Sequence, residues 1–183
     1  MKPNLLVGDF LFVSKWDYGY SRYSFPFGLP LFDGKLLEKS PKRGDIIVFK
    51  LPTNESINYV KRLVAMPGET IKISDGMIYV KKKGANVFKM YSQTLMEPFF
   101  DDQYNADIMR LQENNTNRNY EVLNLSNNSM LDNTNEFLVP NDHYFFMGDN
   151  RDNSSDSRDT RNTVGFVPKE NIIGKVRFIF LSI

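Results

Sequence analysis

Two stretches of the 183-residue sequence carry side chains that could act on a substrate. The first is residues 58–64 (NYVKRLV), where two cations, Lys61 and Arg62, stand in a run typical of a β-strand. Alternation along a strand directs the two cations to opposite faces, each between apolar neighbours of its own face. Either the strand lies at a sheet edge and both charges reach water, or Lys61 is desolvated until its pKa falls toward neutrality. In the second case the free amine could serve as a general base.

The second stretch is residues 148–158 (GDNRDNSSDSR), which contain no apolar side chain and follow a strand-like run. A solvated loop would have this composition. A calcium-binding loop is disfavoured because glycine at the sixth position and glutamate at the twelfth are missing. Alternatively, Asp156 and Arg158 pair to hold a turn, and the hydroxyls of Ser154 and Ser157 point into a site.

Other chemistries are excluded or disfavoured by composition. The absence of cysteine excludes disulfides, cysteine-ligated zinc and a thiol nucleophile, and a single histidine excludes multi-histidine metal sites. His143 lies near Asp142 and several serines, but no nucleophile-elbow motif supports a catalytic triad. A net charge of +1 disfavours a nucleic-acid partner. We therefore expect no metal, no organic cofactor and no nucleic acid.

The elements that must position these residues are predicted to be short β-strands. Each is rich in Val, Ile, Phe or Tyr and is flanked by turns that contain Gly, Pro, Asn or Asp. The expected strands are Asp9–Ser14, Asp45–Lys50, Asn58–Ala65, Thr70–Ile73, Met77–Lys82, Tyr144–Gly148 and Gly174–Leu181. Asp75-Gly76 predicts a hairpin turn because both residues tolerate positive φ. The fold class is therefore mostly β, and helix-dominated folds are disfavoured.

Composition divides the chain into a core and an insert. Residues 83–140 are polar, and their second half is rich in asparagine, which favours turns over strand pairing. We therefore expect residues 1–82 and 141–183 to form one β core. Residues 83–140 are expected to be a smaller, loop-rich inserted region of lower stability.

An aromatic segment from Trp16 to Phe32 is unusual for a soluble surface. Its rings either pack on the core or lie at a membrane interface, where aromatic side chains partition to the headgroup level. The sequence has no run of 18 or more apolar residues, so no transmembrane helix is expected within it.

Four motifs, taken in order, resemble the conserved boxes of bacterial type I signal peptidase, also called leader peptidase. They are residues 3–9 (PNLLVGD), residues 43–49 (RGDIIVF), residues 59–62 (YVKR) with 67–69 (PGE), and residues 148–158 (GDNRDNSSDSR). The resemblance implies a signal-peptidase-type β core of antiparallel sheets. It also implies a membrane-associated serine endopeptidase with a serine–lysine dyad, which removes signal peptides from exported preproteins.

Carried over by motif, the resemblance implies a role for several residues. Lys61 would be the general base, Ser154 would orient its amine, and Asp156 with Arg158 would form a supporting ion pair. The pocket for small side chains, suited to Ala-X-Ala ahead of the cleaved bond, would be formed by Met1, Leu5, Leu11, Val48, Tyr59 and Val60.

The resemblance also implies features that this sequence lacks. In the family, the nucleophilic serine precedes the Met-x-Pro that appears here as Met1-Lys2-Pro3, and the membrane anchor lies upstream. We therefore expect a truncated chain that is inactive without this serine. Its location would be the bacterial inner membrane, with the catalytic domain on the periplasmic side and Trp16–Phe32 on the lipid surface. The alternative is a non-catalytic remnant that binds signal peptides or membrane. A self-cleaving repressor-type peptidase is disfavoured because no DNA-binding helical region is present.

Overall fold

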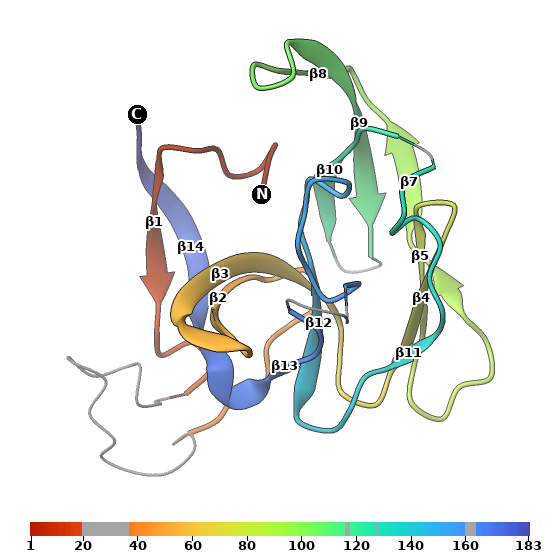
Figure 1. Ribbon diagram of the computed structural model, residues 1–183. Coiled ribbons are helices and arrows are strands. Elements are labelled where there is room, and N and C mark those ends of the chain that lie inside the picture. The colour runs from red at the N-terminus through yellow and green to blue at the C-terminus, as the bar shows by residue number, and fades with distance from the viewer. Residues whose placement is uncertain (20–36, 116–117, 127, 160–163) are drawn as a thin grey trace.

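The computed structural model describes residues 1–19, 37–115, 118–126, 128–159 and 164–183, and nearly all of its regular structure is β-strand (Figure 1). The only helical element in these ranges is the three-residue 3-10 helix η3 (Lys169–Asn171). None of the described helices is long and apolar enough to cross a membrane. The prediction of a mostly β fold is therefore confirmed.

The largest sheet has six strands in the order β1-β14-β2-β3-β12-β13, and all its pairs are antiparallel. Its strands come from both ends of the chain: β1 (Asp9–Ser14), β2 (Ile46–Leu51), β3 (Asn54–Ala65), β12 (His143–Met147), β13 (Val167–Pro168) and β14 (Ile172–Ser182). The strand β3 that carries Lys61 and Arg62 lies inside this sheet, between β2 and β12. The edge-strand interpretation of the two cations is therefore wrong.

Two smaller sheets are formed by the middle of the chain. One has the order β11-β4-β5-β6, with strands β4 (Thr70–Ser74), β5 (Met77–Lys81), β6 (Lys89–Met90) and β11 (Phe137–Leu138). The other combines β7 (Ser92–Leu95), β8 (Phe99–Asp101), β9 (Ala106–Asn114) and β10 (Asn119–Asn124). The first of these sheets pairs strands from both sides of residue 82, so the division into core and insert stays a prediction.

The region 83–140 contains more strand than its asparagine content suggested. The asparagines lie mostly where strands end: Asn114 and Asn119 flank the connection between β9 and β10, and Asn124 ends β10. Asn105, in the turn between β8 and β9, adopts a φ of 48°. Asparagine therefore marks the turns here, as its local hydrogen bonding favours, while apolar residues occupy the strands between them.

The hairpin predicted at Asp75-Gly76 is present. Strands β4 and β5 pair up to Ser74 and Met77, and the two turn residues have φ values of 51° and 72°. Both angles lie in the left-handed region that a two-residue hairpin of the type I′ kind requires. All seven strands expected from the sequence occur, with ends shifted by a few residues.

Strands β3 and β12 separate two hydrophobic cores. Leu63 and Phe146 belong to one core, whereas their neighbours Val64 and Phe145 belong to the other, and all four are fully buried. This is the consequence of strand alternation in a strand covered on both faces. It also means that Lys61 and Arg62 point into different surroundings.

Candidate active site

Lys61 and Ser154 come together from β3 and from the loop that follows β12. The Lys61 amine donates a hydrogen bond to Ser154 Oγ over 2.9 Å, and both side chains are partly buried. Gly148 makes this approach possible, since a Cβ at that position would overlap Ser154 Oγ and lie 3.4 Å from Lys61 Nζ. Glycine is therefore required by space at the start of this loop.

The surroundings of Lys61 weaken its hold on the proton. Burial lowers the pKa of the amine, and the positive charge of Arg158 adds to this effect. The carboxylates of Asp156 and Asp149 act in the opposite direction without overcoming it. In the described part of the chain no carboxylate lies within ion-pair distance of Lys61, so its proton is held less tightly than on an exposed lysine.

Asp156 and Arg158 form a buried ion pair behind Ser154. Arg158 Nε donates to Asp156 Oδ1 and Nη2 donates to Oδ2, both over 2.9 Å, and the Gly148 amide donates to Oδ2 over 3.0 Å. Burial opposes ionisation of Asp156, yet the charge of Arg158 and hydrogen bonds from Arg158, Gly148 and Ser154 hold its pKa below the ordinary value. The carboxylate of Asp156 is therefore fixed and ionised close to the loop that carries Ser154.

The amino end of Met1 lies in the same region as Lys61. Burial and the positive charge of Lys61 lower the pKa of the Met1 amino group, with Asp149 acting in the opposite direction. Two positive groups that influence each other in this way share a partly dehydrated environment. Met1 also lines the same cavity as Val60, the residue directly before Lys61 in sequence.

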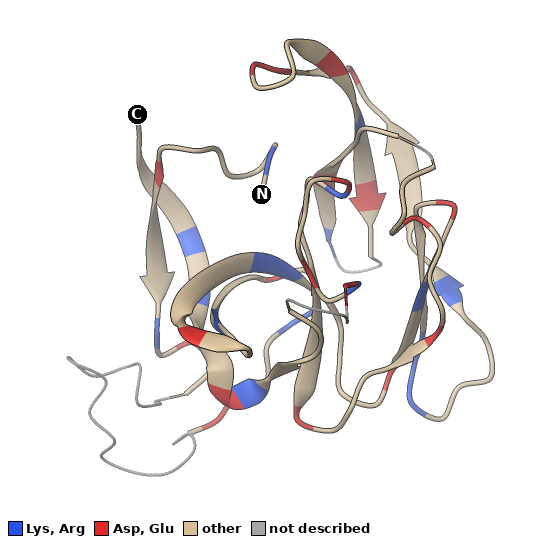
Figure 2. Ribbon diagram, viewed as in Figure 1, with Lys and Arg blue, Asp and Glu red and all other residues tan. Residues whose placement is uncertain are grey.

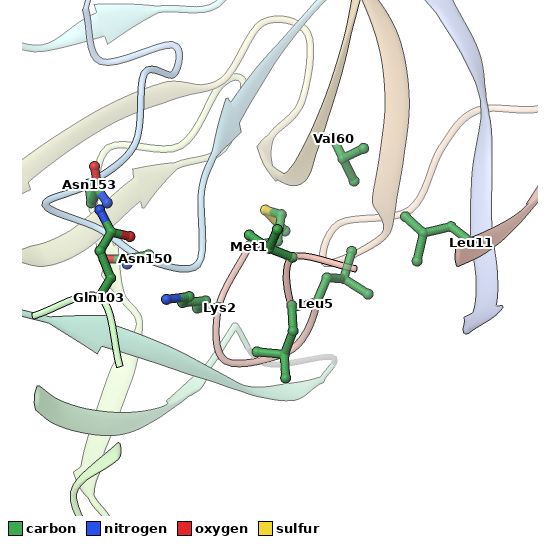
Figure 3. A pocket seen from close by; sticks show the side chains of 10 residues that line it. Met1, Lys2, Leu5, Leu11, Val60, Gln103, Asn150 and Asn153 are labelled. Atoms are coloured by element: carbon green, nitrogen blue, oxygen red, sulfur yellow. The ribbon is translucent and has the colours of Figure 1, made fainter. Parts of the chain in front are cut away.

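A cavity of about 340 Å³ adjoins this site (Figure 3). Four of the expected substrate residues line it, namely Met1, Leu5, Leu11 and Val60. The other two do not: Val48 is buried beside Val60 on the neighbouring strand, and the Tyr59 ring packs on the core. Tyr59 lies on the same face of β3 as Lys61, whose amine is 5.5 Å from the centre of its ring. The roles of all six in substrate binding stay predictions.

The comparisons with known proteins agree on one family. The model of the family described as "Signal peptidase, peptidase S26" matches residues 1–181. A curated relative, Signal peptidase I of Rickettsia typhi, is 38% identical over 190 residues, covering 100% of this chain and 69% of that protein. The chain belongs to the peptidase S26 family.

A second curated relative gives a similar result. Signal peptidase I of Rickettsia felis is 38% identical over 187 residues, covering 100% of this chain and 68% of that protein. Among solved structures, the crystal structure of a signal peptidase I from Enterococcus faecalis is 27% identical with a TM-score of 0.42, covering 76% of this chain and 98% of that chain.

The structure adds two buried ion pairs that sequence reasoning on this S26 protein missed. Arg62 donates to both oxygens of Asp149, over 2.7 Å each, and Arg151 donates to both oxygens of Glu113, over 2.8 and 2.6 Å. The partners are 87 and 38 residues apart in sequence, so spacing could not reveal them. Strand alternation did indicate that Arg62 points to the face of β3 opposite Lys61, and this was the only sequence signal for a separate site around Arg62.

The expected lipid-contacting segment Trp16–Phe32 lies largely outside the described residues, which stop at residue 19 and resume at residue 37. Trp16 is 57% exposed, whereas Tyr18 is buried and its hydroxyl donates to Asp45 Oδ2 over 2.8 Å. The two described rings of this segment therefore differ, one packing inside and one facing out.

A second group of exposed rings was not predicted. Phe10 and Phe12 on β1 face Phe180 and Phe178 on β14, with ring centroids 5.9 and 5.0 Å apart, and all four are exposed. The signal that could have found them is the alternation of phenylalanines along each strand. Elsewhere, basic and acidic residues are mixed along the strands (Figure 2).

Proposed function

We propose that this chain carries the catalytic part of a signal peptidase that removes N-terminal signal peptides from exported preproteins, with Lys61 as the general base. The observation that carries the proposal is the state of the Lys61 amine. It is partly buried, its pKa is lowered, and it is held by Ser154 over 2.9 Å. A positioned neutral amine is able to take a proton from a hydroxyl group.

The proposed nucleophile is a serine joined to the amino end of Met1, as the family resemblance implies. Its oxygen attacks the scissile carbonyl carbon while its proton passes to Lys61 Nζ, and the lysine then gives that proton to the departing amine. Water next attacks the acyl-enzyme ester and again loses a proton to Lys61. The serine is restored and the signal peptide leaves as a carboxylate. Met1 lines the same cavity as Val60, the residue directly before Lys61, and this supports the placement.

Ser154 is proposed to position the lysine rather than to attack. It accepts a hydrogen bond from the Lys61 amine, and its hydroxyl contributes to the lowered pKa of Asp156. Arg158 holds Asp156 through two hydrogen bonds, and this ion pair stabilises the loop from which Ser154 reaches the amine. The lone pair of the neutral amine is then left for the attacking hydroxyl.

The substrate is proposed to lie extended along a strand edge, with its small side chains in the apolar part of the cavity. Leu5, Leu11 and Val60 line this part, and a shallow apolar wall admits a methyl group more readily than a large side chain. Ala-X-Ala ahead of the cleaved bond fits this surface.

The proposed location is the outer side of the bacterial inner membrane. The exposed rings of β1 and β14 and the exposed Trp16 support contact with lipid, since aromatic side chains favour the headgroup region.

The test uses the chain with a serine placed directly before Met1 and a peptide containing Ala-X-Ala. We expect cleavage after the second alanine. The change Lys61→Arg, which keeps the positive charge but cannot lose its proton, should lower kcat by about 10²-fold or more. Lys61→Met should have the same effect without the charge.

The matched control is the same chain with alanine in place of the added serine, which should be inactive while folding normally. Cleavage by Lys61→Arg at the parent rate would overturn the role given to the lysine. Binding of the signal peptide without cleavage by the serine-bearing chain would instead favour a binding protein of the same fold.

A further inference from the structure

The hairpin formed by β8 and β9 meets the first residues of the chain, although 99 positions separate the contacting residues (Figure 1). Lys2 Nζ donates to both oxygens of Asp101, over 2.7 and 2.8 Å. The Asp101 side chain is fully buried, and that of Lys2 is 20% exposed. Water therefore screens this ion pair less than it screens a surface pair.

Asp101 also shapes the turn of this hairpin. Its Oδ1 accepts a hydrogen bond from the Gln103 amide over 2.9 Å, and its carbonyl accepts one from the Tyr104 amide over 3.1 Å. One carboxylate thus holds both the side chain of Lys2 and the backbone at Gln103. Gln103 in turn lines the cavity beside Met1.

A second contact fixes the same N-terminal segment two residues further on. Asn4 Nδ2 donates to the Glu121 carbonyl over 2.7 Å and to Asp149 Oδ2 over 2.8 Å. Lys2 and Asn4 are therefore both held by parts of the molecule distant in sequence. The position of Met1, and of any group joined to it, follows from these two attachments.

The cavity has two chemically different ends, with Met1 between them (Figure 3). One end is apolar and is formed by Leu5, Leu11 and Val60. The other end is lined by three residues with side-chain amides, Gln103, Asn150 and Asn153. If a small side chain ahead of the cleaved bond fills the apolar end, an extended chain that passes Met1 continues into the amide end.

We infer that the β8–β9 hairpin completes the peptidase site: the Lys2–Asp101 ion pair positions the nucleophile-bearing segment, and Gln103 contacts the substrate residue that follows the cleaved bond. This inference rests on the proposed function. An amide both donates and accepts hydrogen bonds, so the residue favoured at that position is polar. Lys2 and Asp101 are positioning residues, and Gln103 determines specificity.

The first experiment tests the ion pair in the serine-bearing chain. Lys2→Met should lower kcat about 10- to 100-fold by misplacing the nucleophile, while KM changes little. Lys2→Arg keeps a cation and should restore most of kcat. Because Asp101→Asn could destabilise the fold, the double variant Lys2→Met with Asp101→Leu, which leaves no buried charge, is measured beside it by circular dichroism and kinetics.

The result of each variant is decisive. A kcat for Lys2→Met equal to that of the parent, with cleavage otherwise normal, would overturn the positioning role and leave the peptidase proposal intact. A parent chain that cleaves nothing would overturn both. If the double variant folds and its kcat is as low as that of Lys2→Met, the low kcat comes from losing the ion pair. It then does not come from leaving the buried Asp101 carboxylate unpaired.

The second experiment tests Gln103 with two peptides that differ only after the cleaved bond, one with glutamine and one with leucine there. Gln103→Leu should shift the ratio of their kcat/KM values about tenfold toward the leucine peptide. Tyr104→Phe, on the same turn but outside the cavity lining, is the matched control and should leave the ratio unchanged. An unchanged ratio in Gln103→Leu would refute the specificity role.

Discussion

The two faces of β3 treat neighbouring positive charges in opposite ways. On one face, Lys61 is partly buried and its direct partner is the hydroxyl of Ser154. On the other face, Arg62 is buried more deeply and is held by both oxygens of Asp149, by the Gly44 carbonyl, and by the Tyr120 ring 4.0 Å away. Burial opposes the charge on both faces, yet the pKa of Lys61 falls and that of Arg62 rises.

The difference lies in the partner rather than in burial. A carboxylate in contact offsets the cost of burying a cation, whereas a neutral hydroxyl offers a hydrogen bond without a charge. One strand can therefore hold a structural cation and a proton acceptor at adjacent positions. Because side chains alternate along the strand, Lys61 cannot reach the carboxylate that pairs with Arg62 on the opposite face.

The largest expected effect comes from removing the structural cation. Arg62→Met leaves the buried Asp149 carboxylate without its main partner and should lower the free energy of unfolding by about 3–5 kcal/mol. Urea unfolding followed by circular dichroism measures this change. Combining Arg62→Met with Asp149→Leu should recover a large part of the loss. A single variant as stable as the parent would contradict the contrast between the two faces.

A smaller loss is expected from crowding the Lys61 face. In Gly148→Ala the added methyl group overlaps Ser154 Oγ, so the serine and the loop must move. Overpacking of this kind costs about 1–3 kcal/mol. The displaced serine no longer accepts a hydrogen bond from the charged amine, so the pKa of Lys61 should fall further, which NMR of its labelled side chain would measure. In Gly84→Ala nothing lies within 4 Å of the added group, so any loss of stability there reports the strain of its φ of 76° and not crowding.

The pH dependence of stability should also differ between the faces. The folded chain lowers the pKa of Lys61, so the unfolded chain binds more protons at this residue between the two pKa values. Stability contributed by this site should therefore rise with pH across that window, and the cost of the buried ammonium is fully present below it. Lys61→Met should remove this rise in urea unfolding curves. A parent and a variant with parallel pH profiles would contradict the lowered pKa.

The smallest expected effect concerns an exposed ion pair. Lys72 and Glu136 are 3.9 Å apart with side chains 35% and 51% exposed. Lys72→Met keeps the apolar stem and should change the free energy of unfolding by less than about 0.5 kcal/mol. The same urea measurement checks this value. A loss of unfolding free energy close to that of Arg62→Met would show that burial does not determine how much an ion pair contributes to stability.

The sequence predicted the local features well because their causes are local. The hairpin at Asp75-Gly76 follows from the φ values these residues tolerate, and the opposite directions of Lys61 and Arg62 follow from alternation. The four motifs also identified the family that the comparisons show. The roles assigned to Lys61, Ser154, Asp156 and Arg158 rest on the resemblance and await the experiments above.

The features that escaped prediction depend on contacts between distant parts of the chain. Glu113 lies in a region whose composition indicated loops, yet it is fully buried because Arg151 meets it from a loop 38 residues away. The position of β3 inside the sheet depends on β12, which pairs with it from much later in the sequence. The contact between Lys2 and Asp101 likewise needs the completed fold. No local pattern contains this information.

The pairing of β1 with β14 has a consequence for the order in which the molecule can assemble. In the described sheet β1 is an edge strand whose sole neighbour is β14, and Asp9 pairs with Ser182. During synthesis β1 emerges long before β14 and has no strand to join until residues 172–182 have also emerged. Leu11, which lines the cavity, therefore reaches its place only after β14 has been synthesised. A nascent chain stalled before residue 172 should expose β1 to proteases that the finished protein resists.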